Sequence, residues 1–284
     1  MAAWDVTVNG VNLNTPGTGV SALPGFGKFP GRNFSDVSLS GVDGISTVLG
    51  GLAQGQFGMA LWVDGVDMRT GAPPSGLTPE AQAWRNLEWI MGLFSVDLLV
   101  TVAVPMPNGV VRQAVCKMTA ATEPEWFSAE TCRFNLAFEI PTVCWESPEP
   151  MVTVYTGTGG TFTLPDLADG NAIISDAVVK VLGPATTPVV SVINPFQSGN
   201  NSFVQLKRNL TAGQVWTIDS GQMTSKVGTT SVLSDTSYAG RGQGLLRMSP
   251  TPTATGRYYQ LSFTGGATAT AATRVNVSAK VKWY

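Results

Sequence analysis

The composition of this chain of 284 residues excludes several classes of function. It contains no histidine, which removes Ser-His-Asp and Cys-His nucleophilic sites, histidine bases and histidine-containing zinc sites. Charged residues make up only 13%, and a net charge of −2 does not fit a general nucleic-acid binder. Because 43% of the residues are apolar, the chain is nevertheless expected to fold.

Charge is distributed unevenly along the chain. Residues 1–145 carry 7 basic and 12 acidic side chains, a net of −5, whereas residues 146–284 carry 10 basic and 7 acidic side chains, a net of +3. This asymmetry predicts two domains with different neighbours.

Two segments of the first half alternate apolar and polar residues around a turn dipeptide. Residues 6–13 do so around Asn9-Gly10, and residues 59–68 around Asp64-Gly65. Both dipeptides tolerate the positive φ angles of tight hairpin turns, so the sequence predicts a β-hairpin at each.

One segment breaks the strand pattern. Thr78 can cap a helix, Pro79 suits the first helical position, and Glu80 favours the positive end of the helix dipole. The apolar residues that follow recur at helical spacing: Trp84, Leu87, Ile90, Met91 and Phe94. The sequence predicts a single helix over about 79–94 that packs on a sheet.

Strands are again predicted after this helix. Residues 98–104 and 110–118 flank Pro105-Met-Pro-Asn-Gly109 and indicate a longer hairpin, and residues 133–140 alternate cleanly. Three prolines between 141 and 150 then indicate a linker.

Beyond this linker short strands recur and no helical period appears. The predicted strands cover residues 152–155, 178–182, 189–193, 202–206, 215–218, 258–263 and 275–283. The Thr/Gly/Ala-rich stretches near 156–163 and 264–273 are interpreted as loops. Short strands at this spacing are typical of a sandwich of two antiparallel sheets.

The cysteines, Cys116, Cys132 and Cys144, are odd in number and lack CxxC spacing, so they are interpreted as reduced thiols in or near a core. Their role is left open. The first residues show no secretory signal, and the most apolar stretch, residues 98–106, is too short to span a bilayer. A protein made in a cytoplasm and soluble there is expected.

No segment carries a convincing catalytic, cofactor or metal site. Glu123, Glu125 and Glu130 lie around Trp126 and could suggest a glycosidase carboxylate pair beside a sugar platform, but a solvated turn is the preferred interpretation. Asp64 and Asp67 lack the further ligands of a calcium loop. Residues 240–244 are glycine-rich but lack the Gly-Lys-Ser/Thr end of a phosphate-binding Walker loop. We therefore predict no catalytic residue, no cofactor and no metal.

The eight tryptophans allow sugar stacking as an alternative. However, Trp62, Trp84 and Trp216 lie on predicted apolar faces, where packing in a core is the ordinary explanation.

The order of motifs in the second half resembles a known family. A Gly-Pro…Pro strand at 182–193 is followed by Leu-x-x-Gly-x-x-x-x-Ile-Asp at 210–219, a Leu-x-Phe strand at 259–265, and a closing strand that ends at Trp283. In this order the motifs resemble the C-terminal half of siphophage distal tail proteins. Residues 39–44, the single helix and the Pro141–Trp145 exit are similar to the first half of that family.

The resemblance implies a ring-forming β-barrel or sandwich domain over residues 1–147 and a peripheral, galectin-like β-sandwich over residues 148–284. It also implies a virion protein, assembled in the host cytoplasm, that forms hexameric rings at the tail tip. Its implied partners are the tail tube protein and the tip hub or tail-associated protein, with the tape measure protein as a further candidate. DNA would pass through the ring, and the negative first half would repel it. Extra loops near 65–75 and 222–244 distinguish this chain from smaller members.

Two other classes stay open beside this structural role. One is a carbohydrate-binding or receptor-binding tail component whose second domain grips a host glycan. The other is an enzyme, a glycosidase using the region 123–130, which lacks both histidine and a persuasive carboxylate pair. A non-enzymatic protein is the preferred prediction, and the ring's symmetry, its interface residues and the host are not predicted.

Overall fold

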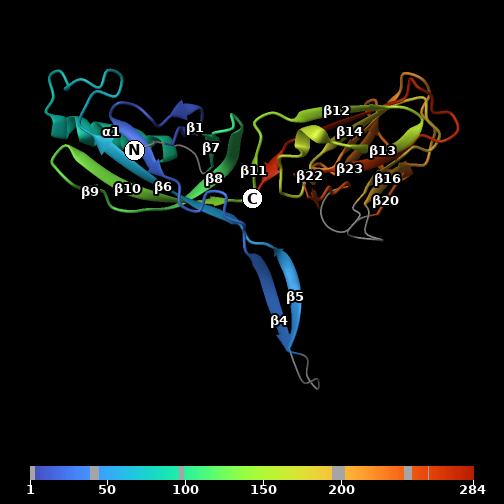
Figure 1. Ribbon diagram of the computed structural model, residues 1–284, viewed down its shortest axis with the longest axis horizontal. Coiled ribbons are helices and arrows are strands. Elements are labelled where there is room, and N and C mark those ends of the chain that lie inside the picture. Colours follow the sequence, from blue (N-terminus) through green and yellow to red (C-terminus); the bar gives the residue numbers. More distant parts are fainter. Residues whose placement is uncertain (1–3, 39–44, 96–98, 194–201, 240–244, 255) are drawn as a thin grey trace. The chain divides into compact units, whose positions relative to one another are not determined.

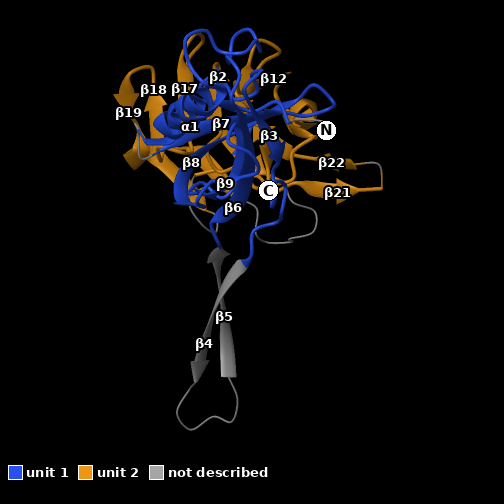
Figure 2. Cartoon of the chain, turned by 90° about the vertical axis from the view of Figure 1, so that its left-hand side faces the viewer, with its two compact units in different colours: residues 1–146, 284 blue, residues 147–283 orange. Residues whose placement is uncertain are grey.

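The computed structural model describes residues 4–38, 45–95, 99–193, 202–239, 245–254 and 256–284, with only the backbone described for residues 32–38 and 45–52. The chain divides into two compact units, which are coloured separately in Figure 2. Unit 1 holds residues 1–146 with Tyr284, and unit 2 holds residues 147–283. Among the described residues the structure is nearly all β with one α-helix (Figure 1), which confirms the predicted fold class.

Unit 1 is built around one large antiparallel sheet whose main path runs β2-β1-β7-β8-β10-β6-β3, with β9 beside β10 and β11 beside β8. Its strands are β1 (Thr7–Val8), β2 (Val11–Asn12), β3 (Thr18–Ala22), β6 (Gly55–Asp64), β7 (Val100–Pro105), β8 (Val111–Ala121), β9 (Glu125–Trp126), β10 (Thr131–Ile140) and β11 (Trp145–Glu146). A separate hairpin pairs β4 (Arg32–Ser38) with β5 (Ile45–Leu52). Residues 39–44, which carry one of the family-like motifs, lie outside the described residues.

The core of unit 1 lies between this sheet and the helix α1 (Pro79–Ser95), which contacts β6 and β10 (Figure 1). The strands supply alternate buried residues, such as Leu61 on β6 and Phe134 on β10. The helix supplies Leu87, Ile90 and Phe94 from one stripe. The helix predicted over 79–94 is thus confirmed and ends one residue later.

Hairpin predictions succeed where the turn residues adopt the required backbone angles. Asn9 and Gly10 have φ angles of 49° and 79° and join β1 to β2, as predicted. The hairpin of β7 and β8 is also confirmed. The prediction of a hairpin at Asp64-Gly65 is wrong, because β6 ends at Asp64 and, among the described residues, pairs with β10 and β3 but not with a strand after Gly65.

Gly65 has a different role, which depends on tertiary contacts. A Cβ atom at this position would clash with the carbonyl oxygen of Pro79, so the glycine allows the start of α1 to approach the chain closely. Asn86, which is fully buried on α1, donates hydrogen bonds from Nδ2 to the carbonyl oxygens of Asp64 (2.7 Å) and Val66 (2.9 Å). These bonds hold the turn against the helix.

Unit 2 is a pair of antiparallel sheets (Figure 1). The six-stranded sheet has the order β12-β24-β14-β17-β18-β19, and the five-stranded sheet has the order β13-β23-β15-β16-β20. The strands are β12 (Met151–Thr156), β13 (Gly159–Thr163), β14 (Val178–Leu182), β15 (Val189–Val192), β16 (Phe203–Leu206), β17 (Val215–Asp219), β18 (Thr224–Val227), β19 (Thr230–Ser231), β20 (Thr236–Ala239), β21 (Thr251–Thr253), β22 (Gly256–Tyr258), β23 (Gln260–Thr264), β24 (Arg274–Ala279) and β25 (Lys282–Trp283), with 3-10 turns at η1 (Pro165–Leu167) and η2 (Leu233–Asp235).

The core of unit 2 is formed by the alternate residues that both sheets turn inward, among them Val179, Trp216 and Phe263. Two parts predicted as loops are strands instead. Residues 159–163 form β13, which pairs with β23, and the region 222–244 contains β18, β19 and β20. Glycine lowers the sequence signal there because it is depleted in strands, while pairing with an established neighbour supplies the ladder hydrogen bonds.

Candidate assembly surfaces

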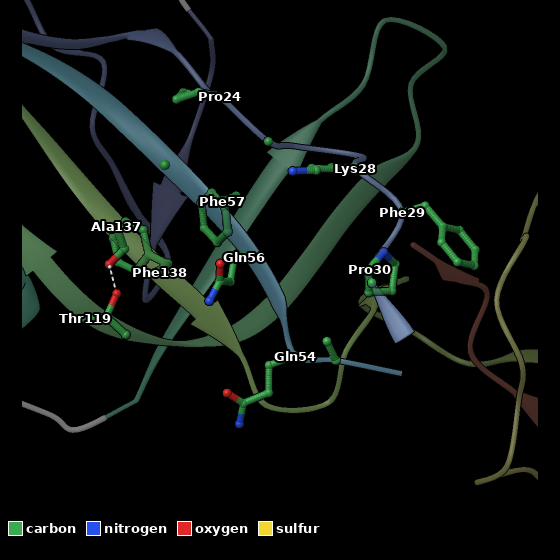
Figure 3. A pocket seen from close by; sticks show the side chains of 14 residues that line it. Pro24, Lys28, Phe29, Pro30, Gln54, Gln56, Phe57, Thr119, Ala137 and Phe138 are labelled. Carbon is green, nitrogen blue, oxygen red and sulfur yellow. Dashed lines mark hydrogen bonds between the residues drawn. The ribbon is translucent and has the colours of Figure 1, made fainter. Parts of the chain in front are cut away.

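An open groove of about 890 Å³ lies on unit 1 and is lined by residues before β4, after β5 and along β6, β8 and β10 (Figure 3). Phe57 and Phe138 stack at its floor with ring centroids 5.0 Å apart. Gln54, Gln56 and Thr119 line it as well, and Thr119 Oγ1 donates to the carbonyl of Ala137 (3.2 Å). Lys28 is its sole ionisable lining residue among those described. The lining therefore provides hydrogen bonding and apolar contact but not a pair of groups for acid–base catalysis.

Two tryptophans of α1 and β9 lie in contact, the one on α1 exposed and the one on β9 partly buried. Trp84 is 47% exposed, and its ring lies 4.9 Å from that of Trp126, centroid to centroid. The prediction that Trp84 lies in the core is wrong. The buried stripe of the helix runs through Ala83, Leu87 and Ile90, which turns Trp84 to its border. Exposed tryptophans of this kind commonly contribute strongly to protein interfaces.

Trp62 also departs from the prediction. It alternates with the buried Leu61 and Val63 on β6, so it lies on the opposite face of the sheet and is only partly buried. There it covers Gly19 of β3, where a Cβ atom would lie 2.6 Å from Trp62 Nε1. Trp216, in contrast, is fully buried as predicted.

The acidic cluster around Trp126 forms no paired carboxylate site among the described residues. Glu123, Glu125 and Glu130 are all exposed, and no hydrogen bond joins any two of them. Glu125 instead accepts a hydrogen bond from Arg133 Nε at 3.2 Å, and the Arg133 guanidinium lies 4.7 Å from the ring centre of Phe127. This arrangement fits a solvated turn better than a glycosidase site.

Asp64 and Asp67 are occupied by turn hydrogen bonds. Asp67 Oδ1 accepts from the backbone of Arg69 and Thr70 and from Thr70 Oγ1. The Thr70 backbone hydrogen bond, followed by that from its hydroxyl, holds the pKa of Asp67 below its usual value. Across the described residues no group of three cysteine or acidic side chains is placed to hold a metal ion. Residues 240–244 lie outside the described part.

All three cysteines are buried thiols. Burial raises the pKa of the Cys116 thiol to about 12, and burial also raises the pKa of Cys132. The Cys144 thiol donates to the carbonyl of Thr142 at 3.5 Å. A protonated, buried thiol is a poor nucleophile, so Cys116 and Cys132 contribute to packing.

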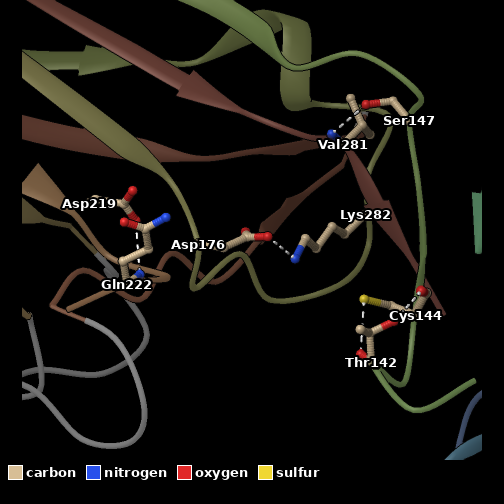
Figure 4. A network of polar contacts seen from close by, with 8 residues as sticks. All are labelled: Thr142, Cys144, Ser147, Asp176, Asp219, Gln222, Val281 and Lys282. Carbon is tan, nitrogen blue, oxygen red and sulfur yellow. Dashed lines mark hydrogen bonds and ion pairs between the residues drawn. The ribbon is translucent and has the colours of Figure 1, made fainter. Parts of the chain in front are cut away.

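Unit 2 contains a polar network near its first residues and its last strand (Figure 4). Lys282 is buried, and its Nζ lies 2.6 Å from Asp176 Oδ2. Ser147 Oγ accepts from the backbone of Val281 (3.1 Å) and donates to the carbonyl of Glu149 (2.7 Å). Both ends of unit 2 are thereby tied into its fold.

Within the described residues, no helix is both long enough and apolar enough to cross a membrane.

The structure defines a two-unit, nearly all-β chain with one helix on its first sheet and a β-sandwich as its second unit. A solved structure shares this fold throughout its length: the SPP1 Dit (gp 19.1) protein, described as a paradigm of the hub adsorption apparatus in phages that infect Gram-positive bacteria. The TM-score is 0.66 at 13% identity, and the alignment covers 99% of each chain. The resemblance to distal tail proteins is thus confirmed at the level of the fold.

Two chains of the phage P2 baseplate in its activated conformation, one with Ca and one with Sr, align less well. Their TM-scores are 0.38 and 0.37 at 11% identity, over 95% of this chain and 92% of theirs. No family model and no curated protein matches the sequence.

Proposed function

We propose that this chain is a structural virion protein of a long-tailed phage tail tip, and that about six copies form a ring that joins the tail tube to the tip hub. The observation that carries this proposal is the likeness to the SPP1 Dit protein, which extends over 99% of both chains and includes both units. The order of sequence motifs supports the same proposal independently. In this role the chain binds other proteins and performs no reaction.

The chemistry of unit 1 is compatible with such a ring. A closed ring requires contacts between two different surfaces of neighbouring copies, and exposed aromatic side chains such as Trp84 and Phe127 are suited to such contacts. The net negative charge of residues 1–145 would keep DNA from adhering to a ring formed by this unit.

Light scattering on the purified chain, followed by negative-stain imaging, tests the proposal. We expect a closed particle of about six subunits of 29.8 kDa with a central hole. A chain that stays monomeric at about 100 µM, where a contact of micromolar affinity would be saturated, would contradict self-assembly into a ring.

Carbohydrate binding is the second candidate function, and the Trp84–Trp126 pair, of which Trp84 is exposed, favours it because indole faces can stack on sugar rings. Both tryptophans of unit 2, Trp216 and Trp283, are buried, so they cannot provide such a platform. Specific binding on a cell-wall glycan array that is lost in Trp84→Ala, with the fold retained, would support this function over a purely structural one.

A further inference from the structure

One edge of unit 2 is left open for pairing with another strand. β12 is an outer strand of the six-stranded sheet, and all six of its residues, Met151–Thr156, pair with β24 without a register shift. Among the described residues no backbone hydrogen bond reaches the other side of β12, although η1 lies near it. Val152 and Val154 are 57% and 55% exposed.

The other outer strands on the main paths of the three large sheets are each weakened as pairing surfaces. β19 and β2 are only two residues long, and β3 has a register shift between Val20 and Ala22. β13 begins with two glycines, of which Gly160 has a φ angle of 144°. β20 has four residues.

Soluble proteins usually protect long edges with charges, prolines or bulges, because an open edge accepts foreign strands. β12 contains no charged residue and no proline, and it has no bulge. We propose that β12 is an interaction surface for β12 of a second copy of this chain, which adds antiparallel so that the two six-stranded sheets become continuous.

The sequence of β12 is self-complementary in one such register. If the two-fold axis passes through Thr153, each Val152 lies opposite Val154 of the second copy on the exposed face. On the other face each Met151 lies opposite Tyr155 of the second copy. Residues with the same orientation therefore meet on both faces, as a continuous sheet requires.

Charge does not oppose this pairing. The nearest cation on the exposed face is Arg274, which lies one strand inward and opposite Thr156 at the end of β12. The two-fold axis at Thr153 places the two copies of Arg274 at opposite ends of the joined strands, so they do not repel each other closely.

The contact is expected to be weak by itself. An edge of six residues buries far less than the roughly 1,200 Å² of a stable interface. It also joins only two copies, because a two-fold contact cannot close a ring. The pairing is thus additional to the proposed ring and does not rest on it. If a ring presents several copies of β12 at once, the apparent affinity of the contact increases.

Disulfide trapping of the full chain tests the register directly. In Thr153→Cys the two Cα atoms of the pair would lie about 4.5–5.5 Å apart, within the range that a disulfide bridges. The native cysteines are buried, so wild type provides a low background. Under mild oxidation with oxidised glutathione, non-reducing electrophoresis should show a linked dimer of Thr153→Cys.

The matched control is Thr161→Cys, because Thr161 is exposed on β13, the edge strand of the other sheet. We expect Thr153→Cys to form dimer about tenfold faster than this control. Adding Val154→Lys at the exposed Val154 should return the rate to that of the control. Equal rates of dimer formation for the two cysteine variants, or no effect of Val154→Lys, would overturn the proposal. This holds even if β12 binds a different protein, because the proposal names a second copy of this chain as the partner.

The outcome is independent of ring formation. Particles that form rings without linkage through residue 153 would contradict the strand pairing alone. Linked dimers of a chain that forms no ring would support the strand pairing and contradict the ring.

Discussion

At the scale of single residues, burial decides the chemistry that this chain retains. With no histidine, cysteine is the natural candidate for a nucleophile, yet all three thiols are buried. The Cys116 thiol is completely inaccessible, and its pKa of about 12 means that it stays protonated at any physiological pH. The residue thus contributes to stability through packing, and its ionisation couples that stability to pH.

The effect of Cys116 on stability should appear in alkaline solution. In the unfolded chain the thiol ionises near pH 9.0, whereas in the folded chain it keeps its proton up to about pH 12. Between these values the folded state binds more protons, so the free energy of unfolding falls as the pH rises, by about 1.4 kcal/mol per pH unit from this group. Urea unfolding should show a shallower decline above pH 9 for Cys116→Ala than for wild type. Parallel pH profiles of the two proteins would contradict this assignment.

At the scale of elements, the attachment of α1 to β6 depends on a polar residue within an apolar stripe. Asn86 lies on the buried face of the helix, accepts a hydrogen bond from Gln82 Nε2 (2.8 Å), and donates to the carbonyl oxygens of Asp64 and Val66. The chain therefore turns after β6 without a second strand that pairs back on it. The turn is held by the hydrogen bonds from Asn86 on the helix.

Asn86→Ala should destabilise unit 1 by about 2–4 kcal/mol, because two carbonyl oxygens lose their donor in a buried place. Arg85→Ala, at the neighbouring exposed position on the same helix, is the control and should change stability by less than about 0.5 kcal/mol. Urea unfolding of the two variants measures the difference. Equal stabilities would show that Asn86 does not hold the turn.

At the scale of the whole molecule, the two compact units should respond separately to substitutions in their cores. Unit 2 has its own buried network: Trp216 Nε1 donates to Ser225 Oγ (2.8 Å), which lies 2.8 Å from Thr236 Oγ1. Since the Thr236 hydroxyl donates to the carbonyl of Val232 (2.7 Å), Ser225 must donate to Thr236. Ser225 thus connects the polar groups of two buried side chains.

Ser225→Ala leaves the indole N–H of Trp216 without its partner and should cost about 1–3 kcal/mol. In scanning calorimetry we expect Ser225→Ala to lower the transition of unit 2 alone, and Asn86→Ala to lower the transition of unit 1 alone. Ser231→Ala, at an exposed position on β19, should leave both transitions in place. A single transition that both core variants shift equally would mean that the units unfold together.

The sequence by itself determined the features that depend on neighbouring residues in the chain. Thr78-Pro79-Glu80 set the start of the helix, the φ-tolerant Asn9-Gly10 pair set a hairpin, and the period of two placed Phe134, Leu136 and Phe138 in the core. The lack of histidine likewise limited the possible chemistry.

Only the tertiary structure decided which faces and edges are covered. Gly65 was predicted in a hairpin turn, but it allows the close approach of Pro79. Trp84 was predicted in the core, but it is exposed. Residues 159–163 were predicted as a loop, but they pair with β23 and form a strand. The open edge of β12 could not be recognised from its sequence either. Local patterns fix backbone preferences within a few residues, whereas burial and pairing depend on segments that are distant in sequence and meet only in the folded chain.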